Sequence, residues 1–127
     1  MLPASCSPPI STDDGFIEES HRAGGPNLCG FPSVFCGTIS VEECPMEDIW
    51  TIATKWDIKI ITFYMGNFKP RFELSKEPTP TLRLRAPNKS KTHWLEAARE
   101  IYQRLCEDGL HIAVEILDES YDFLSNI

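Results

Sequence analysis

The sequence lacks the features that would place a protein in a membrane or send it out of the cell. No apolar run approaches the roughly 18 residues that a membrane-spanning helix needs. The first ten residues contain no basic segment, and Pro3, Pro8 and Pro9 interrupt them before the apolar core of a secretory signal can form. We therefore expect an intracellular protein, cytoplasmic or nuclear, with no membrane partner.

The tight cysteine and histidine spacings of zinc sites are also missing. The nearest approach to a ligand set is a group of four residues separated by seven, six and seven others: His21, Cys29, Cys36 and Cys44. Recognisable zinc sites contain closer pairs, such as C-x2-C or H-x3-H. The odd number of cysteines, five, favours reduced thiols. The sequence thus predicts neither metal nor cofactor, and a cysteine- or zinc-dependent enzyme stays open only as a further alternative.

What the chain does have is enough apolar residues for one domain and an uneven distribution of charge. It has 127 residues, 42% of them hydrophobic, and a net charge of -7. Residues 1–54 hold eight acids and one base, residues 55–91 nine bases and three acids, and residues 92–127 eight acids and two bases. The overall negative charge disfavours nucleic acid as a partner, although the central segment is basic.

Composition divides the chain into an arm and a domain. Residues 1–43 are rich in Pro, Gly and acids and show no sustained period, so we predict a flexible arm there, with 37–41 as a candidate edge strand. Residues 44–127 are predicted to form a single α+β domain. The predicted elements are helix 45–55, strands 57–65, 68–75 and 81–86, helix 92–108 and strand 110–117.

The order of these elements sets the predicted architecture. Gly66 and Asn67 are read as a hairpin turn, and the helix between the last two strands favours a parallel pair. Trp94, Ala98 and Leu105 belong to an apolar stripe at helical spacing on that helix. The predicted fold is α+β, a mixed sheet of about four strands in the order α-β-β-β-α-β with two main helices packed on it.

This order resembles the common core of the PD-(D/E)xK nuclease superfamily. The resemblance implies metal-binding acids on the second strand and a D/E-x-K triplet on the third. Here the second predicted strand offers Glu73, but the third reads Leu-Arg-Leu-Arg at 82–85 and has no acid. Arginines at those positions would repel the metal ion. An active nuclease is therefore not expected, and a degenerate relative that binds nucleic acid remains an alternative.

Six basic residues of the central segment make up the binding-site hypothesis: Lys59, Lys69, Arg71, Arg83, Arg85 and Lys89. If the predicted strands adjoin, Arg71, Arg83 and Arg85 share one sheet face, on which a phosphate backbone or an acidic peptide could lie. The competing interpretation is that Glu73 and Glu115 neutralise them as cross-strand pairs. We favour this second interpretation, because runs of charge usually only solvate a face.

Four segments are similar to a module of uncharacterised filamentous-fungal proteins: WDIKII at 56–61, TLRLRAP at 81–87, WLEAAREIYQRL at 94–105 and GLHIAVEILD at 109–118. In some of those proteins the module precedes a trypsin-like region. The resemblance implies an intracellular accessory domain and defines no functional residues. We accordingly expect a non-enzymatic protein-interaction or regulatory module whose partner is a protein. A second copy of the chain, met through an edge strand, is a further candidate partner.

Overall fold

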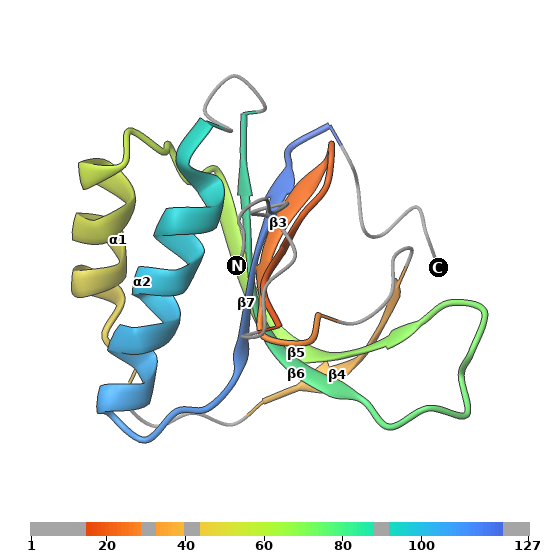
Figure 1. Cartoon of the computed structure of the whole chain (residues 1–127). Coiled ribbons are helices and arrows are strands. Elements are labelled where there is room, and N and C mark those ends of the chain that lie inside the picture. Colours follow the sequence, from red (N-terminus) through yellow and green to blue (C-terminus); the bar gives the residue numbers. More distant parts are fainter. Residues whose placement is uncertain (1–14, 29–32, 40–43, 88–91, 121–127) are drawn as a thin grey trace, which may run out of the picture.

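The computed structural model describes residues 15–28, 33–39, 44–87 and 92–120, which form an α+β fold. The elements are β2 (Ile17–Glu18), β3 (Arg22–Gly25), β4 (Ser33–Thr38), α1 (Met46–Lys55), β5 (Thr62–Pro70), β6 (Thr79–Ala86), α2 (Trp94–Glu107) and β7 (Ala113–Asp118). Both helices lie on the same face of a six-stranded sheet (Figure 1). Within these residues no helix is both long and apolar enough to cross a membrane.

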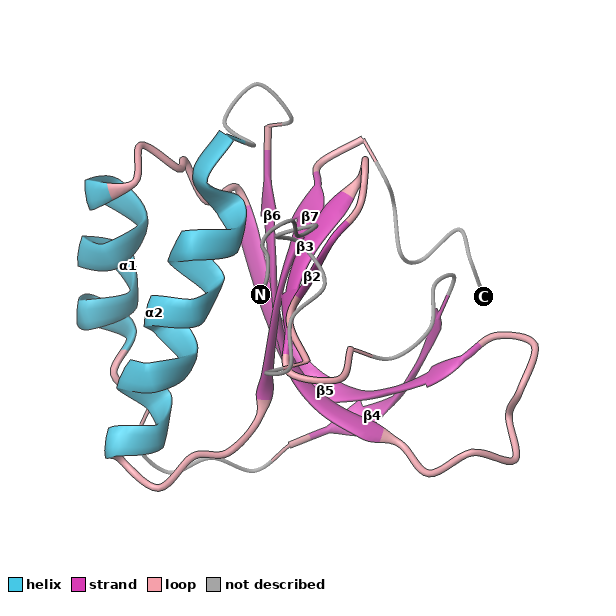
Figure 2. Ribbon diagram, viewed as in Figure 1, coloured by secondary structure: helices cyan, strands magenta, loops and turns pink. Residues whose placement is uncertain are grey.

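The strands lie side by side in the order β2-β3-β7-β6-β5-β4. β6 and β7 run parallel and are joined through α2, which confirms the predicted parallel pair. All other neighbouring strands are antiparallel. β4 and the adjoining parts of β5 and β6 bend toward the side of the sheet opposite the helices (Figure 2). We call this second side, which neither helix covers, the open face.

The face under the helices carries the apolar core. The predicted stripe of α2 is confirmed, because Trp94, Ala98 and Leu105 are fully buried there. These side chains pack on alternate residues of the central strands, such as Leu84 of β6 and Ile116 of β7. Both predicted helices are found, and the sequence placed their ends within one or two residues of those observed. Burial of this face is the main apolar contribution to folding.

The predicted number and order of strands need correction. The sheet has six strands instead of about four, and the order is β-β-β-α-β-β-α-β instead of α-β-β-β-α-β. Among the described residues between the two helices, the strands are β5 and β6, where three strands were expected. The topology on which the resemblance to the nuclease core rests is therefore not the one observed between the helices.

The miscount arises at Gly66 and Asn67, which are not a turn. They lie within β5, where Gly66 pairs with Thr81 of β6. A Cβ at Gly66 would come within 2.4 Å of the Phe35 ring, so the glycine makes room for an aromatic side chain of β4. Residues 57–61, predicted as strand, precede β5: Asp57 and Ile58 donate backbone hydrogen bonds to the last turn of α1.

The described part of the predicted arm supplies three strands of the sheet. Residues 22–25 form β3, which pairs with β7 through Gly24 and Glu115. A Cβ on Gly24 would lie 1.9 Å from the carbonyl oxygen of Val114, and its φ of 151° is one that L side chains rarely adopt. The glycines that suggested a mobile chain are thus needed for close approach of two backbones. Residues 1–14, 29–32 and 40–43 of the predicted arm lie outside the described residues.

Candidate functional site

A buried ion network is the main polar feature of the open face. Glu115 of β7 accepts hydrogen bonds from two arginines on the strands beside it. Its Oε1 lies 2.5 Å from Nε of Arg83 on β6, and its Oε2 lies 2.8 Å from Nη1 of Arg22 on β3. All three side chains are at most 5% exposed. One carboxylate is therefore shared by two guanidinium groups, away from water.

Strand register explains why these side chains meet. In the parallel pair of β6 and β7, Arg83 lies directly opposite Glu115. In the antiparallel pair of β3 and β7, Glu115 is opposite Gly24, and Arg22 lies two residues away on the same face. Gly24 allows the close approach of β3 to β7 that brings Arg22 diagonally within reach of Glu115. The network is thus a direct result of the β3-β7-β6 arrangement.

Further contacts extend the network across the sheet. Arg22 Nε donates to Glu19, which directly follows β2, at 2.7 Å. Arg83 Nη2 donates to Ser33 Oγ of β4 at 2.8 Å, and its guanidinium carbon lies 4.0 Å from the ring centroid of Phe68 on β5. Each strand, or in the case of β2 the residue after it, thus contributes to one connected set of side chains.

The electrostatics of this set favour a structural role. Burial alone would lower the pKa of Arg22, but the carboxylates of Glu115 and Glu19 together outweigh it, and the pKa lies above its ordinary value. Arg83 Nη1 is buried and has no hydrogen-bond partner within the described part of the chain. Breaking such a pair leaves an uncompensated buried charge, which is strongly destabilising. The arginines of the network therefore serve the fold and present no charge to a partner.

The structure does not bring the six predicted binding residues together. Arg83 is internal, and its pairing with Glu115 is the cross-strand pair that the favoured interpretation expected. Arg85 donates through Nη2 to the backbone oxygen of Glu119 at 2.5 Å. Arg71 lies after the end of β5 and not on a strand beside the other two arginines.

The remaining lysines of the hypothesis lie apart from that network. Lys69 donates to the Leu74 backbone oxygen at 3.2 Å. Lys59 lies beyond α1, at a shallow hollow that Thr54 also lines. Lys89 lies outside the described residues. Glu73, the other expected partner, is 3.6 Å from Lys76 instead of facing an arginine of the sheet.

The metal candidates can be followed only in part. Cys29 lies outside the described residues. His21 is 3.9 Å from Glu19, Cys36 is exposed on β4, and Cys44 is half-buried next to Met46. Burial raises the pKa of the Cys44 thiol, which disfavours the reactive thiolate. Among the described side chains, no group of three or more His, Cys, Asp or Glu is arranged to hold a metal ion.

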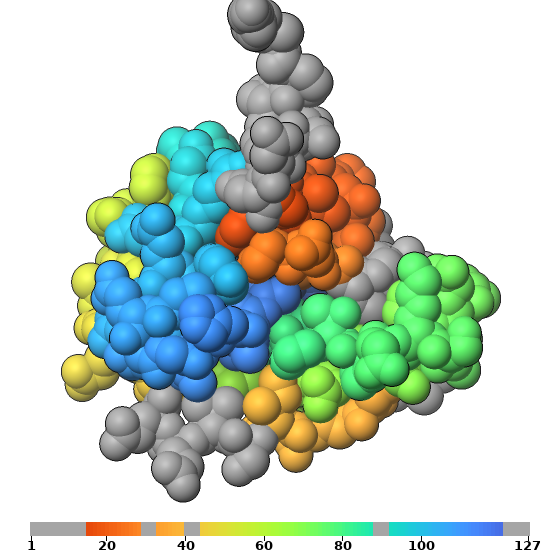
Figure 3. Space-filling view, turned by 60° about the horizontal axis from the view of Figure 1, so that its bottom comes forward, coloured from red at the N-terminus to blue at the C-terminus, as the bar shows by residue number. Residues whose placement is uncertain are grey.

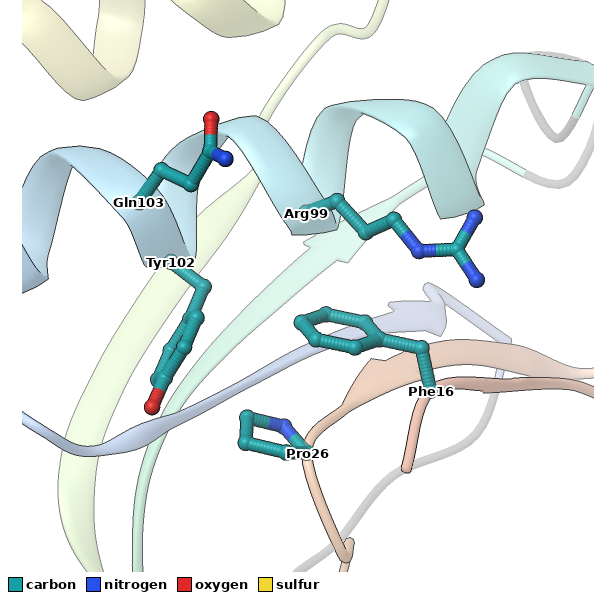
Figure 4. A pocket seen from close by; sticks show the side chains of 5 residues that line it. All are labelled: Phe16, Pro26, Arg99, Tyr102 and Gln103. Atoms are coloured by element: carbon teal, nitrogen blue, oxygen red, sulfur yellow. The ribbon is translucent and has the colours of Figure 1, made fainter. Parts of the chain in front are cut away.

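A depression of about 420 Å³ lies between α2 and the start of the β2–β3 hairpin (Figure 4). Its described lining residues are Phe16, Pro26, Arg99, Tyr102 and Gln103. Phe16 packs edge-to-face on Tyr102, with ring centroids 5.8 Å apart, and Arg99 lies over the Phe16 ring. The described lining residues include neither a carboxylate nor a thiol. The apolar side chains of the depression, together with the Arg99 guanidinium, could contact another molecule.

Besides Tyr64, the exposed large apolar side chains of the described residues form two groups on β5 and the segments next to it. The first is the loop of residues 71–78 between β5 and β6, which we call the hairpin tip; it projects from the body of the molecule (Figures 1 and 3). Phe72 and Leu74 of the tip are 82% and 56% exposed. The second comprises Trp50, Ile61 and Phe63, which we call the edge patch; Phe63 packs edge-to-face on Trp50 at 6.0 Å.

Comparison of the chain with protein-family models, with curated proteins and with solved structures gave no match. The resemblances stated from the sequence therefore stay predictions. Arg22 and Ser33 were missed as members of the network because they lie in the predicted arm. The signal that could have found Arg22 is its position next to the Ala-Gly-Gly sequence, since glycines of a strand often mark close backbone approach.

Proposed function

We propose that this chain is a non-enzymatic protein-binding module and that the hairpin tip is its main contact surface. The observation that carries the proposal is the exposure of Phe72, 82% of whose surface is accessible on a loop that projects from the sheet. Single exposed apolar residues are common. Here, however, an aromatic ring and Leu74 stand two residues apart on the same projection, the kind of group that anchors protein interfaces.

The tip is held in shape before any partner binds. Glu73 and Lys76 donate backbone hydrogen bonds to Pro70 and Glu73 at 3.2 and 3.0 Å, and the Lys69 amine reaches the Leu74 carbonyl. The Arg71 guanidinium lies 5.9 Å from the Phe72 ring centroid. A preordered loop loses less conformational freedom on binding than a disordered one. The partner best suited to it has an apolar pocket with acidic groups at its rim, opposite Lys69 and Arg71.

Nucleic-acid binding, the alternative drawn from the basic central segment, has less support. It needs cations on a common surface. Arg83 is instead buried against Glu115, and Arg85 is engaged with the backbone of Glu119. Fluorescence anisotropy with short DNA and RNA at low and moderate salt tests this alternative. Salt-sensitive binding that is lost in Lys69→Ala/Arg71→Ala would replace the present proposal.

The proposal is tested by quantitative affinity capture from extract with the whole chain as bait. We expect a set of proteins that binds the wild type and the control Glu77→Ser but is lost from Phe72→Ser/Leu74→Ser. The control changes an exposed polar residue of the same loop. All three baits should be equally stable to within about 0.5 kcal/mol, as is usual for surface changes. Identical protein sets from all three baits would rule out the tip as the contact surface.

The remaining alternative, a cysteine- or zinc-dependent enzyme, is tested by different measurements. Elemental analysis of the purified chain reports bound zinc, and timed iodoacetamide labelling reports any thiol that reacts selectively fast. A stoichiometric zinc content, or one thiol that labels far ahead of the others, would favour that alternative over a binding module.

A further inference from the structure

Strand β5 is unequally flanked along its length. β6 pairs with it from Thr62 to Phe68, but β4 pairs with it only from Gly66 onward. At its beginning, around Thr62 and Phe63, the described residues therefore provide one neighbouring strand and none on the outer side. An outer strand edge of this kind presents backbone N–H and C=O groups that can pair with another chain.

The side chains at this beginning of β5 are apolar and exposed. Ile61 and Phe63 are 45% and 47% exposed, and Trp50 of α1 extends the same surface. Trp50, Ile61 and Phe63 are the edge patch defined above. Natural sheets protect such edges with a charged side chain, a proline or a very short strand. None of these devices is present between Ile60 and Met65, where all six residues are uncharged and most are β-branched or aromatic.

From these observations we propose that two copies of the chain associate through this edge, with β5 of one copy antiparallel to β5 of the other around Phe63. A twofold arrangement brings each residue of the strand opposite a residue of the same strand, so the surface must complement itself. The uncharged run from Ile60 to Phe68 satisfies this condition, because no register of it places like charges opposite each other.

The charge of the rest of the molecule restricts where a second copy can bind. With a net charge of -7, two copies repel each other in general. The helices present many acids, among them Glu47 and Asp48 on α1 and Glu96 and Glu107 on α2, all of them exposed. In contrast, the edge patch and the start of β5 offer exposed apolar side chains and backbone hydrogen-bonding groups and carry no charged side chain. Pairing there joins the two sheets into one and covers both Phe63 rings.

Light scattering after size-exclusion chromatography, over a wide range of concentration, measures the association of the whole chain. We expect the mass to double as concentration rises. Phe63→Lys should raise the dissociation constant at least about tenfold, because it places like charges directly opposite each other at the twofold axis. Ile61→Lys should also weaken the association, because the arrangement sets residue 61 opposite Met65 of the second copy and brings a charge against an apolar side chain. The matched control is Phe72→Lys, which adds the same charge at the hairpin tip and should leave the association unchanged.

Hydrogen exchange provides a readout that does not depend on whether the variants fold. Amides of residues 62–65 in the wild-type chain should become more protected as concentration rises, whereas amides of the tip should not. A wild type that stays monomeric throughout, or association that persists in well-folded Phe63→Lys and Ile61→Lys, would overturn the proposal. Loss of association in Phe72→Lys alone would also overturn it and would assign self-association to the tip. The capture experiment on the tip has an independent outcome, so failure of either proposal can be recognised.

Discussion

The two faces of the sheet are held in place by different interactions. On the helix side, apolar side chains such as Ile116 pack against α1 and α2. On the open face, Glu115, the preceding residue of β7, is equally buried but is held by Arg22 and Arg83. Apolar packing depends mainly on volume and tolerates conservative change. A buried ion network depends on every member being present, so its tolerance is much lower.

The largest expected effect follows from Glu115→Gln, which keeps the shape of the side chain and removes its charge. Two buried guanidinium groups lose their shared carboxylate, and the free energy of unfolding should fall by about 3–5 kcal/mol. Chemical denaturation measures this loss as a lower transition midpoint, with the slope of the transition unchanged. The control is Glu119→Gln, an exposed carboxylate at the end of the same strand, for which about 0.5 kcal/mol or less is expected. A small loss at Glu115 would show that water reaches the network.

The second prediction replaces the whole network by apolar residues, as Arg22→Met/Arg83→Met/Glu115→Leu. Replacing a buried ion set by apolar side chains of similar volume is often neutral or stabilising. The triple variant should therefore recover most of the stability that Glu115→Gln loses and lie within about 1 kcal/mol of the wild type or above it. If its stability is as low as that of the single variant, the charges themselves contribute net stability and the open face cannot be rebuilt like the helix side.

On the helix side a conservative change should have a moderate effect. Ile116→Val removes one methylene from a fully buried side chain, and the expected loss is about 0.5–1.5 kcal/mol. Denaturation under the same conditions as for Glu115→Gln gives the direct comparison between adjacent residues on opposite faces. Equal losses for the two variants would show that the open face tolerates change as well as the helix side does.

The smallest effect concerns an ion pair at the surface of the helix layer. Hydrogen bonds from Lys55 at 2.6 Å and from the Trp56 indole at 2.9 Å lower the pKa of Glu100 below its ordinary value near 4.5. A carboxyl whose pKa is lowered by folding adds stability above its unfolded pKa and loses it as pH falls through the folded one. Because Glu100 is about one-third exposed, Glu100→Gln should lower stability by less than about 1 kcal/mol at neutral pH.

Measuring the stability of the wild type and of Glu100→Gln as a function of pH tests whether folding lowers the pKa of Glu100. The difference between the wild type and Glu100→Gln should shrink as pH falls below about 4.5, since the wild-type carboxyl then becomes neutral as well. A difference that grows on acidification would contradict the assignment of the lowered pKa to these hydrogen bonds.

Sequence patterns predicted those parts of the fold that depend on local periodicity. The α2 stripe and the parallel pair of β6 and β7 follow from helical spacing and from the short links around the helix. β3 has no such period: its four residues, Arg-Ala-Gly-Gly, become a strand because β2 and β7 lie beside them. β5 was divided in two because Gly66 has the same appearance in a turn as in a tightly packed strand.

The candidate site was predictable to a similar extent. The pairing of Arg83 with Glu115 was anticipated, since both lie on alternating strands predicted to adjoin. The participation of Arg22 could not be, because it depends on a long-range antiparallel contact between β3 and β7. Exposure of Phe72 could not be predicted either, because the predicted strand 68–75 ends at Pro70 in the structure and Phe72 lies in the loop beyond it. Burial of a residue at a strand end depends on where pairing stops, which no local pattern determines.

The network around Glu115 also determines which stretch of chain can act as an autonomous folding unit. A fragment that begins at residue 44, where composition suggests a domain boundary, would lose Arg22 and Ser33 and would uncover one whole side of β7. Glu115 and Arg83 would then remain in a sheet whose edge strand is β7. The described fold therefore includes Phe16, whose ring is buried against α2, and the strands β2, β3 and β4 that precede α1.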